Sequence, residues 1–149
     1  FVGQNLFAKG ACFAAMEILK PEVFKNVIML LDNHVICGIE IDISSYEKPM
    51  RFRLVRPGSN WYTAGRTVEC ILEDMRSITF KIITPENKYY DEVVDISEIP
   101  FREGKTTRVS VSVSFVDSDR CNITIKDLGF GEFVKSSGKV ISKELVLRS

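Results

Sequence analysis

The sequence predicts a mainly β protein, an antiparallel β-sandwich with one α-helix at its N-terminal end. From Val27 onward, apolar and polar residues alternate with the period of two that is typical of strands with one solvent-facing side. Clusters of Pro, Gly, Asn, Asp and Ser separate about eight short strands, with no helical pattern between them. This spacing is typical of an antiparallel sandwich or barrel.

The first twenty residues differ from the rest because their apolar side chains recur at helical spacing. Asn5 can cap a helix, and Lys20 with Pro21 would end it. The apolar stripe of this helix comprises Phe7, Ala11, Ala14, Ala15 and Ile18. Its small side chains permit close approach to another surface. We therefore expect the helix to dock on the rest of the chain or on a part of the protein outside it.

The strands are predicted one after another along the chain. Alternating apolar side chains indicate strands at 39–43, 51–54, 68–72, 78–82, 109–115, 121–125 and 140–147. The clearest is 109–115, in which Val109, Val111, Val113 and Phe115 alternate with serines. Turn residues at 56–60, 85–87, 102–105, 117–119 and 136–139 separate them.

Composition narrows the class of protein. A chain of 149 residues is long enough for one domain plus an attached element. Twenty basic residues against twenty acidic ones leave no net field that would attract nucleic acid. No apolar run approaches the roughly 20 residues that span a bilayer, and the N-terminal end lacks signal-peptide order. We expect a cytoplasmic protein without a membrane partner, and a piece of a longer chain because it begins without methionine.

No catalytic or metal-binding constellation emerges from the sequence. The cysteines Cys12, Cys37, Cys70 and Cys121 are far apart and form no C-x-x-C pair, which disfavours a zinc site. The last three lie in apolar strand patterns and are interpreted as small buried thiols. His34 has no Ser, Cys or carboxylate partner at a recognisable motif spacing. We therefore expect neither an enzyme nor a metal protein.

Two further patterns have simpler explanations than ligand binding. Gly129 and Gly131 form a G-x-G, and Ser137-Gly138-Lys139 resembles part of a phosphate loop, but no helix follows to supply N-terminal amides. Both are interpreted as turns. Arg51, Arg53 and Arg56 precede Trp61 and Tyr62, which could suggest single-stranded nucleic acid. An outward arginine row that discourages edge-to-edge pairing is the favoured explanation.

Several short motifs follow one another in a recognisable order. The helix segment 10–15 reads Gly-Ala-Cys-Phe-Ala-Ala, and Gly38-Ile39-Glu40 begins the first strand. Between them lies an apolar run closed by an aspartate, comprising Val27, Ile28, Met29, Leu30, Leu31 and Asp32. This order resembles the junction of the seventy-kilodalton heat-shock chaperones, in which the last helix of an actin-like ATPase domain leads through an apolar linker into the substrate-binding domain. Segments 77–82, 111–127 and 137–139 are also similar to later strands and turns of that family.

The resemblance implies three parts and a binding site. Residues 1–21 would be the terminal helix of an upstream actin-like ATPase domain, residues 22–34 a linker or first short strand, and residues 35–149 the β-sandwich. In that family the sandwich binds extended apolar peptides through main-chain hydrogen bonds and apolar pockets. Carried over, the peptide-binding positions would be Ile39, Ile41, Ile78 and Phe80. From the residues alone, the same four are also explained as ordinary core.

The expected function is a non-catalytic, chaperone-like module of a divergent bacterial relative. It would bind an extended apolar peptide or unfolded protein segment, regulated by the upstream ATPase domain. ATP is expected only in that upstream domain, and no cofactor in this part. The chain departs from the family at Asp42, where an apolar residue is usual, in a Gly-Phe-Gly-Glu-Phe insertion within 127–139, and in lacking a helical lid. The alternative is a structural or protein-interaction module without a peptide groove.

Overall fold

The computed structural model describes residues 5–19, 32–45, 48–73 and 75–147. Helix α1 (Leu6–Leu19) confirms the predicted N-terminal helix. It begins directly after Asn5, whose carbonyl accepts a hydrogen bond from the Lys9 N–H at 2.9 Å. That bond places Asn5 at the cap position. The predicted helix end at Lys20-Pro21 and the linker residues 27–31 lie outside the described residues, whereas Asp32 is exposed in a turn.

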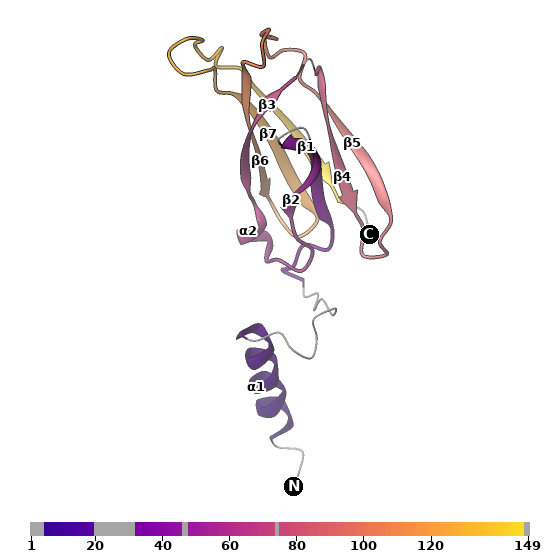
Figure 1. Ribbon diagram of the computed structural model, residues 1–149. Helices are drawn as coiled ribbons and strands as arrows, with labels where there is room; N and C mark the ends of the chain where they lie inside the picture. The colour runs from indigo at the N-terminus through magenta and orange to yellow at the C-terminus, as the bar shows by residue number, and fades with distance from the viewer. Residues whose placement is uncertain (1–4, 20–31, 46–47, 74, 148–149) are drawn as a thin grey trace.

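In the described ranges, eight strands form two four-stranded antiparallel sheets, which confirms the predicted sandwich (Figure 1). The first sheet has the order β2-β1-β4-β5 and the second the order β3-β6-β7-β8. The strands of the first are β1 (Gly38–Ser45), β2 (Lys48–Val55), β4 (Ser77–Ile83) and β5 (Tyr89–Asp95). Those of the second are β3 (Thr67–Leu72), β6 (Thr107–Phe115), β7 (Arg120–Asp127) and β8 (Val140–Val146).

The core lies between the two sheets and is made of the alternating apolar residues of both. The largest fully buried side chains are Phe80, Ile39, Ile41, Leu54, Ile82, Ile123, Ile125, Val35, Val55, Val109 and Val111. Burying one such aliphatic or aromatic side chain contributes roughly 1.5–3 kcal/mol. The period of two in the sequence therefore arises because every second residue of these strands faces the opposite sheet.

Two elements were not among the predicted ones. The first is strand β5, whose sequence lacks a clean apolar–polar alternation. Its inward position opposite Phe80 is the charged Glu92, and the apolar Val93 faces outward and is exposed. The second element is a one-turn helix, α2 (Trp61–Ala64), in a region interpreted from sequence as a turn followed by Trp61. Its start is held by the Trp61 N–H, which donates to the Asn33 carbonyl at 3.1 Å.

Candidate functional site

The four residues predicted to bind peptide lie on the two central strands of the first sheet. Ile39 and Ile41 belong to β1, Ile78 and Phe80 belong to β4, and Ile41 is the register partner of Phe80. All four face the second sheet and are buried, with exposed fractions of 6% or less. The structure thus brings them together within the core, and their contact with a peptide stays a prediction.

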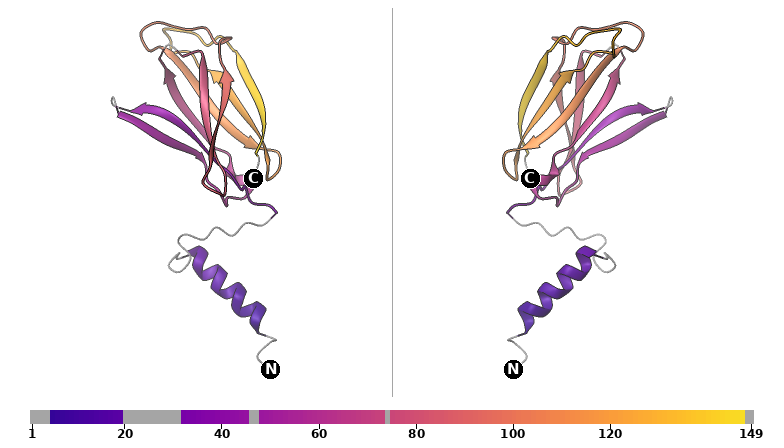
Figure 2. Two further views of the ribbon diagram at one scale, coloured as in Figure 1. Left: turned by 90° about the vertical axis from the view of Figure 1, so that its right-hand side faces the viewer. Right: turned by 90° about the vertical axis from the view of Figure 1, so that its left-hand side faces the viewer.

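The pairing of β1 with β4 stops immediately beyond these residues. It runs from Gly38↔Ile83 to Ile41↔Phe80, whereas β1 stays paired with β2 as far as Ser45↔Lys48. Strand β4 likewise stays paired with β5 back to Ser77↔Asp95. Figure 2 shows the β1–β2 hairpin leaning away from the rest of the sandwich. Residues 42–45 of β1 and 77–79 of β4 therefore flank each other without strand pairing; we call them the unpaired stretch.

At Ile43 and Ile78 the inner face of the unpaired stretch is apolar, and beside Ile43 it is less covered than the core. Continuing the β1–β4 register would set Ile43 opposite Ile78, which is 6% exposed. Ile43 is partly buried, and its register partner on β2, Met50, is 47% exposed. Because directly opposed residues of an antiparallel pair face the same side, Met50 and Ile43 share this inner face. The sandwich core thus opens here onto accessible apolar side chains.

The outer face of the same strands carries a ladder of alternating charges. Arg53 donates to the Glu40 carboxylate at 2.7 Å, and Glu40 is 5% exposed. Asp42 pairs with Lys81 at 2.7 Å and with Arg51 at 3.4 Å. The hydrogen bond from Lys81, supported by Arg51, lowers the pKa of Asp42. Asp42 therefore lies on the outer face, whereas its neighbours Ile41 and Ile43 on the same strand face inward.

Two arginines of the row noted in the sequence, Arg51 and Arg53, belong to this ladder. Arg51 and Arg53 both lie close to the Glu40 carboxylate, and Arg51 also contacts Asp42. Directly opposed unlike charges on neighbouring strands stabilise a sheet by roughly 0.2–1 kcal/mol per pair. These two arginines are therefore partnered by carboxylates of the adjacent strand.

Two surface grooves lie elsewhere and contain none of the predicted peptide-binding residues. The larger, about 780 Å³, lies between the edge strands β5 and β8 and is lined by Tyr90, Glu92, Lys143 and Leu145 among others. The smaller, about 420 Å³, lies between α2 and the β3 and β6 strands and includes Trp61 and Phe115. Both linings mix apolar and polar side chains.

The interpretation of three cysteines as buried thiols is confirmed for Cys37 and Cys121, and only in part for Cys70. Cys37 and Cys121 are fully buried, Cys70 is partly buried, and Cys12 on α1 is exposed. Burial raises the pKa of Cys121 to about 12, and it also raises the pKa of Cys37 and Cys70. Thiols with raised pKa values are poor nucleophiles near neutral pH. Within the described ranges, no group of three or more His, Cys, Asp or Glu side chains could hold a metal ion.

Sequence reasoning did not predict the ion pairs between elements, of which two join distant parts of the sandwich. Arg102, in the loop before β6, forms an ion pair with the buried carboxylate of Asp127 at the end of β7. Lys143 of β8 reaches Glu92 of β5 at 3.0 Å, across from one sheet to the other. One part of the Asp127 site has a sequence signal: an aspartate two residues before a glycine, as in Asp127-x-Gly129, often accepts a hydrogen bond from the backbone that follows it. No local sequence motif at Arg102 or Lys143 indicates the carboxylate with which each one pairs.

Comparisons with known proteins bear on the sandwich. No helix among the described residues is long and apolar enough to cross a membrane. Neither the curated proteins nor the solved structures compared with the chain gave a match. Residues 34–147 match the model of a family described as a domain of unknown function, DUF8552. That range begins at His34, which bridges to Asn60, and ends one residue beyond β8. The chain therefore belongs to the DUF8552 family.

Proposed function

We propose that this sandwich is a non-catalytic module that binds extended apolar peptides, such as segments of unfolded proteins, by strand addition at the unpaired stretch. The observation that carries the proposal is the early end of β1–β4 pairing at Ile41 and Phe80. Strand edges that lose their neighbour present backbone N–H and C=O groups, and an extended peptide can satisfy them. The resemblance to the seventy-kilodalton heat-shock chaperones points to the same ligand class.

The side chains around the unpaired stretch suit such a ligand. In an added strand, alternate side chains of the peptide point toward the inner face. There they would meet Ile43, Ile78 and Met50, of which Met50 is about half exposed. The other side chains of the peptide would lie over the charged outer face, beside Asp42 and Lys81. The module would therefore favour peptides in which apolar residues alternate with polar ones.

Helix α1 supports a second part of the proposal, the link to an upstream actin-like ATPase domain. Its large apolar side chains are exposed, with Phe7 at 90%, Phe13 at 68% and Leu19 at 81%. A helix that is apolar over much of its circumference is usually buried in a larger core. We propose that α1 packs within the upstream domain, where ATP would bind, and that this domain regulates peptide exchange. ATP would then act on peptide affinity from outside the sandwich.

A structural or protein-interaction module without a peptide groove is the alternative. It is favoured by one observation, the burial of Ile39, Ile41, Ile78 and Phe80 in the core. Under this alternative the unpaired stretch would be a surface feature of the domain, and no extended peptide would add to it.

Peptide binding separates the two functions. A fluorescent heptapeptide of alternating apolar and polar residues should raise its anisotropy when the full chain is added, and a copy with every backbone amide N-methylated should not, because neither of its edges has an N–H to donate to a strand. Met50→Glu should weaken binding by about tenfold, the loss expected when one buried apolar side chain no longer contacts the ligand. Val140→Glu is the matched control, since Val140 is similarly exposed at 53% but lies on β8.

Two results would contradict strand addition. Equal binding of the methylated and unmethylated peptides, or equal losses in the Met50→Glu and Val140→Glu variants, would exclude strand addition at the unpaired stretch. Absence of any anisotropy change with a folded chain would favour the structural module. Circular dichroism of each variant checks that the sandwich is folded.

A further inference from the structure

Four strands form the edges of the two sheets, and three of them carry a device that blocks pairing with another chain. The edges are β2 and β5 in the first sheet and β3 and β8 in the second. An unblocked edge is a template for a further strand, and natural sheets protect edges with inward charges, prolines and charged side chains. The four edges of this sandwich can therefore be compared directly.

Strands β5 and β8 protect each other. Glu92 of β5 and Lys143 of β8 both point inward, and the Lys143 ammonium lies 3.0 Å from the Glu92 carboxylate. The same ammonium donates to the backbone carbonyl of Val93 at 2.9 Å. A strand that added to either edge would have to bury or displace this charge pair. Inward-pointing charges are a known protection against edge pairing.

Strand β2 is protected in another way. Pro49 supplies no N–H, so the backbone of β2 cannot offer a complete ladder to a new strand. Arg51 and Arg53 also project from this strand toward the carboxylates of β1. Proline and long cations on an edge both oppose pairing.

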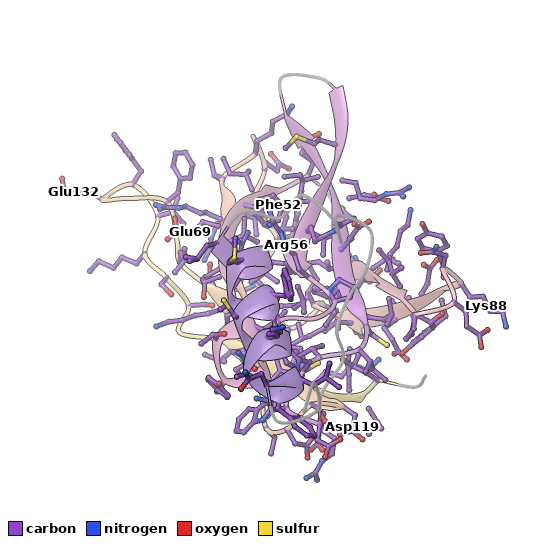
Figure 3. The ribbon with its side chains drawn as sticks, turned by 90° about the horizontal axis from the view of Figure 1, so that it is seen from below. Phe52, Arg56, Glu69, Lys88, Asp119 and Glu132 are labelled. Atoms are coloured by element: carbon purple, nitrogen blue, oxygen red, sulfur yellow. The ribbon has the colours of Figure 1, made fainter. Side chains whose placement is uncertain are left out.

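Strand β3 lacks both the proline and the inward charge that protect the other edges, and its one charged residue, Glu69, points outward and pairs with Arg108. It contains no proline, and its inward residues are apolar: Val68, Cys70 and Leu72 pair with the inward side of β6. Val68 and Cys70 are only partly buried, because no further strand covers them. Among the described residues, no backbone hydrogen bond reaches the edge of β3 that faces away from β6. Figure 3 shows Glu69 of β3 on the side of the molecule opposite Lys88, which precedes β5.

We propose that the free edge of β3 is a self-association site, at which a second copy of this chain adds by antiparallel β3–β3 pairing about a two-fold axis. Two-fold pairing of identical strands permits only a few registers. One would set Glu69 opposite Glu69 of the second copy, and like charges directly opposed destabilise a sheet. The next register sets Glu69 opposite Ile71, Val68 opposite Leu72, and Cys70 opposite its own copy.

The second register sets no like charges directly opposite each other. Glu69 of each copy, which also pairs with Arg108 of its own β6, lies opposite Ile71 of the other copy. Val68, Cys70 and Leu72 of both copies would extend the apolar inner face across the axis. Pairing of one six-residue edge buries less area than a standard interface of roughly 1,600 Å². The dimer is therefore of the weak class and forms with rising protein concentration.

Charge substitutions at Ile71 test this register without touching the core, because Ile71 is 49% exposed on the outer face. Sedimentation equilibrium of the full chain over a concentration series should show a monomer–dimer equilibrium. Ile71→Glu would face Glu69 of the second copy and should weaken the dimer by roughly tenfold over its two symmetric pairs. Ile71→Lys would face the same carboxylate and should leave the dimer as strong or stronger. Val146→Glu, 58% exposed on β8, is the control.

Disulfide trapping tests the two-fold axis. Opposed residues of an antiparallel pair have Cα atoms about 4.5–5.5 Å apart, within the range of a disulfide. In a Cys12→Ser background, which removes the exposed thiol of α1, the azo oxidant diamide at alkaline pH, where the raised pKa of Cys70 still leaves thiolate, should take two electrons and two protons from paired Cys70 thiols. The product should be a covalent dimer, absent in Cys12→Ser/Cys70→Ser.

The results that overturn the proposal are distinct. A chain that stays monomeric at every concentration, or a dimer that Ile71→Glu and Val146→Glu weaken equally, would remove β3 as the site. A dimer weakened by Ile71→Glu that gives no Cys70 cross-link would overturn the stated register. Binding of a different extended protein to β3 by a chain that stays monomeric would overturn self-association.

Discussion

The guanidinium of Arg102 holds the carboxylate of Asp127 with two parallel hydrogen bonds, Nη1 to Oδ1 at 2.8 Å and Nη2 to Oδ2 at 2.7 Å. Asp127 is fully buried at the end of β7. Its carboxylate also accepts hydrogen bonds from the backbone N–H groups of Gly129 and Ser137, at 3.0 and 2.6 Å. One carboxylate thus fixes both ends of the loop that carries the segment Gly129-Phe130-Gly131-Glu132-Phe133.

Asp127→Asn should strongly destabilise the sandwich. The amide cannot form the two-pronged pair with Arg102, and breaking a buried ion pair by removing one partner costs roughly 3–5 kcal/mol. Urea unfolding followed by circular dichroism measures the loss. The control is Asp117→Asn, which removes a more exposed carboxylate that pairs with Arg120 across a turn. Equal losses in the two variants would contradict a special role for Asp127.

The stability of the protein should fall in acid partly through Asp127. The Arg102 guanidinium, with the Ser137 and Gly129 donors, holds the pKa of Asp127 well below its usual range. An unfolded aspartate has a pKa of about 3.9, so as pH falls the unfolded state takes up this proton first. The contribution is present above that pKa and is lost as pH falls toward the folded value.

Asp127→Asn isolates this contribution to the pH dependence. The difference in unfolding free energy between wild type and variant should be constant near neutrality and should shrink below about pH 4, because only wild type loses the carboxylate. Asp117, whose pKa Arg120 and neighbouring amides lower to about 2, adds its own acid dependence, but equally in both proteins. A difference that stays constant down to about pH 2 would contradict the assignment.

Two glycines of the loop after β7, Gly129 and Gly131, should respond differently to alanine. Both have positive φ, +67° at Gly129 and +61° at Gly131, so each substitution carries backbone strain of roughly 1–2 kcal/mol. A Cβ on Gly129 would also lie 2.4 Å from the Val134 carbonyl oxygen and 2.5 Å from the Ser136 nitrogen. A Cβ on Gly131 meets nothing within 4 Å. Gly129→Ala should therefore lower the urea midpoint clearly more than Gly131→Ala, and similar midpoints would contradict the contact.

Alternation predicted the central strands well because their two faces differ sharply. In β6, inward Val109, Val111 and Val113 are buried and alternate with serines, so the sequence itself marks the face. Strand β5 departs from this alternation, because its inward position holds the charged Glu92. Lys143 of the other sheet lies beside that carboxylate and pairs with it. The two residues are 51 positions apart, and nothing local to either one indicates the pairing.

The candidate site could be predicted only in part. The sequence indicated that β1 and β4 carry apolar inner residues, but Ile39, Ile41 and Ile43 have the same pattern although only Ile43 lies in the unpaired stretch. The point at which β1 and β4 stop pairing depends on how far each strand stays paired with its other neighbour, β2 or β5. The residues of β1 by themselves do not determine that point. The chemical character of the site was therefore predictable, and its position along β1 was not.

Removing the inward charges of the edge strands should promote aggregation more than unfolding. Lys143→Val/Glu92→Val replaces a half-buried pair by apolar residues, a change that is often neutral for stability. It also frees the Val93 carbonyl and exposes two apolar edges, so light scattering on prolonged incubation should rise faster than in wild type. Lys88→Val/Glu86→Val removes the same charges from an exposed pair in the β4–β5 turn and is the matched control. Equal scattering by the two double variants would show that lost charge, rather than the uncovered edge, governs aggregation.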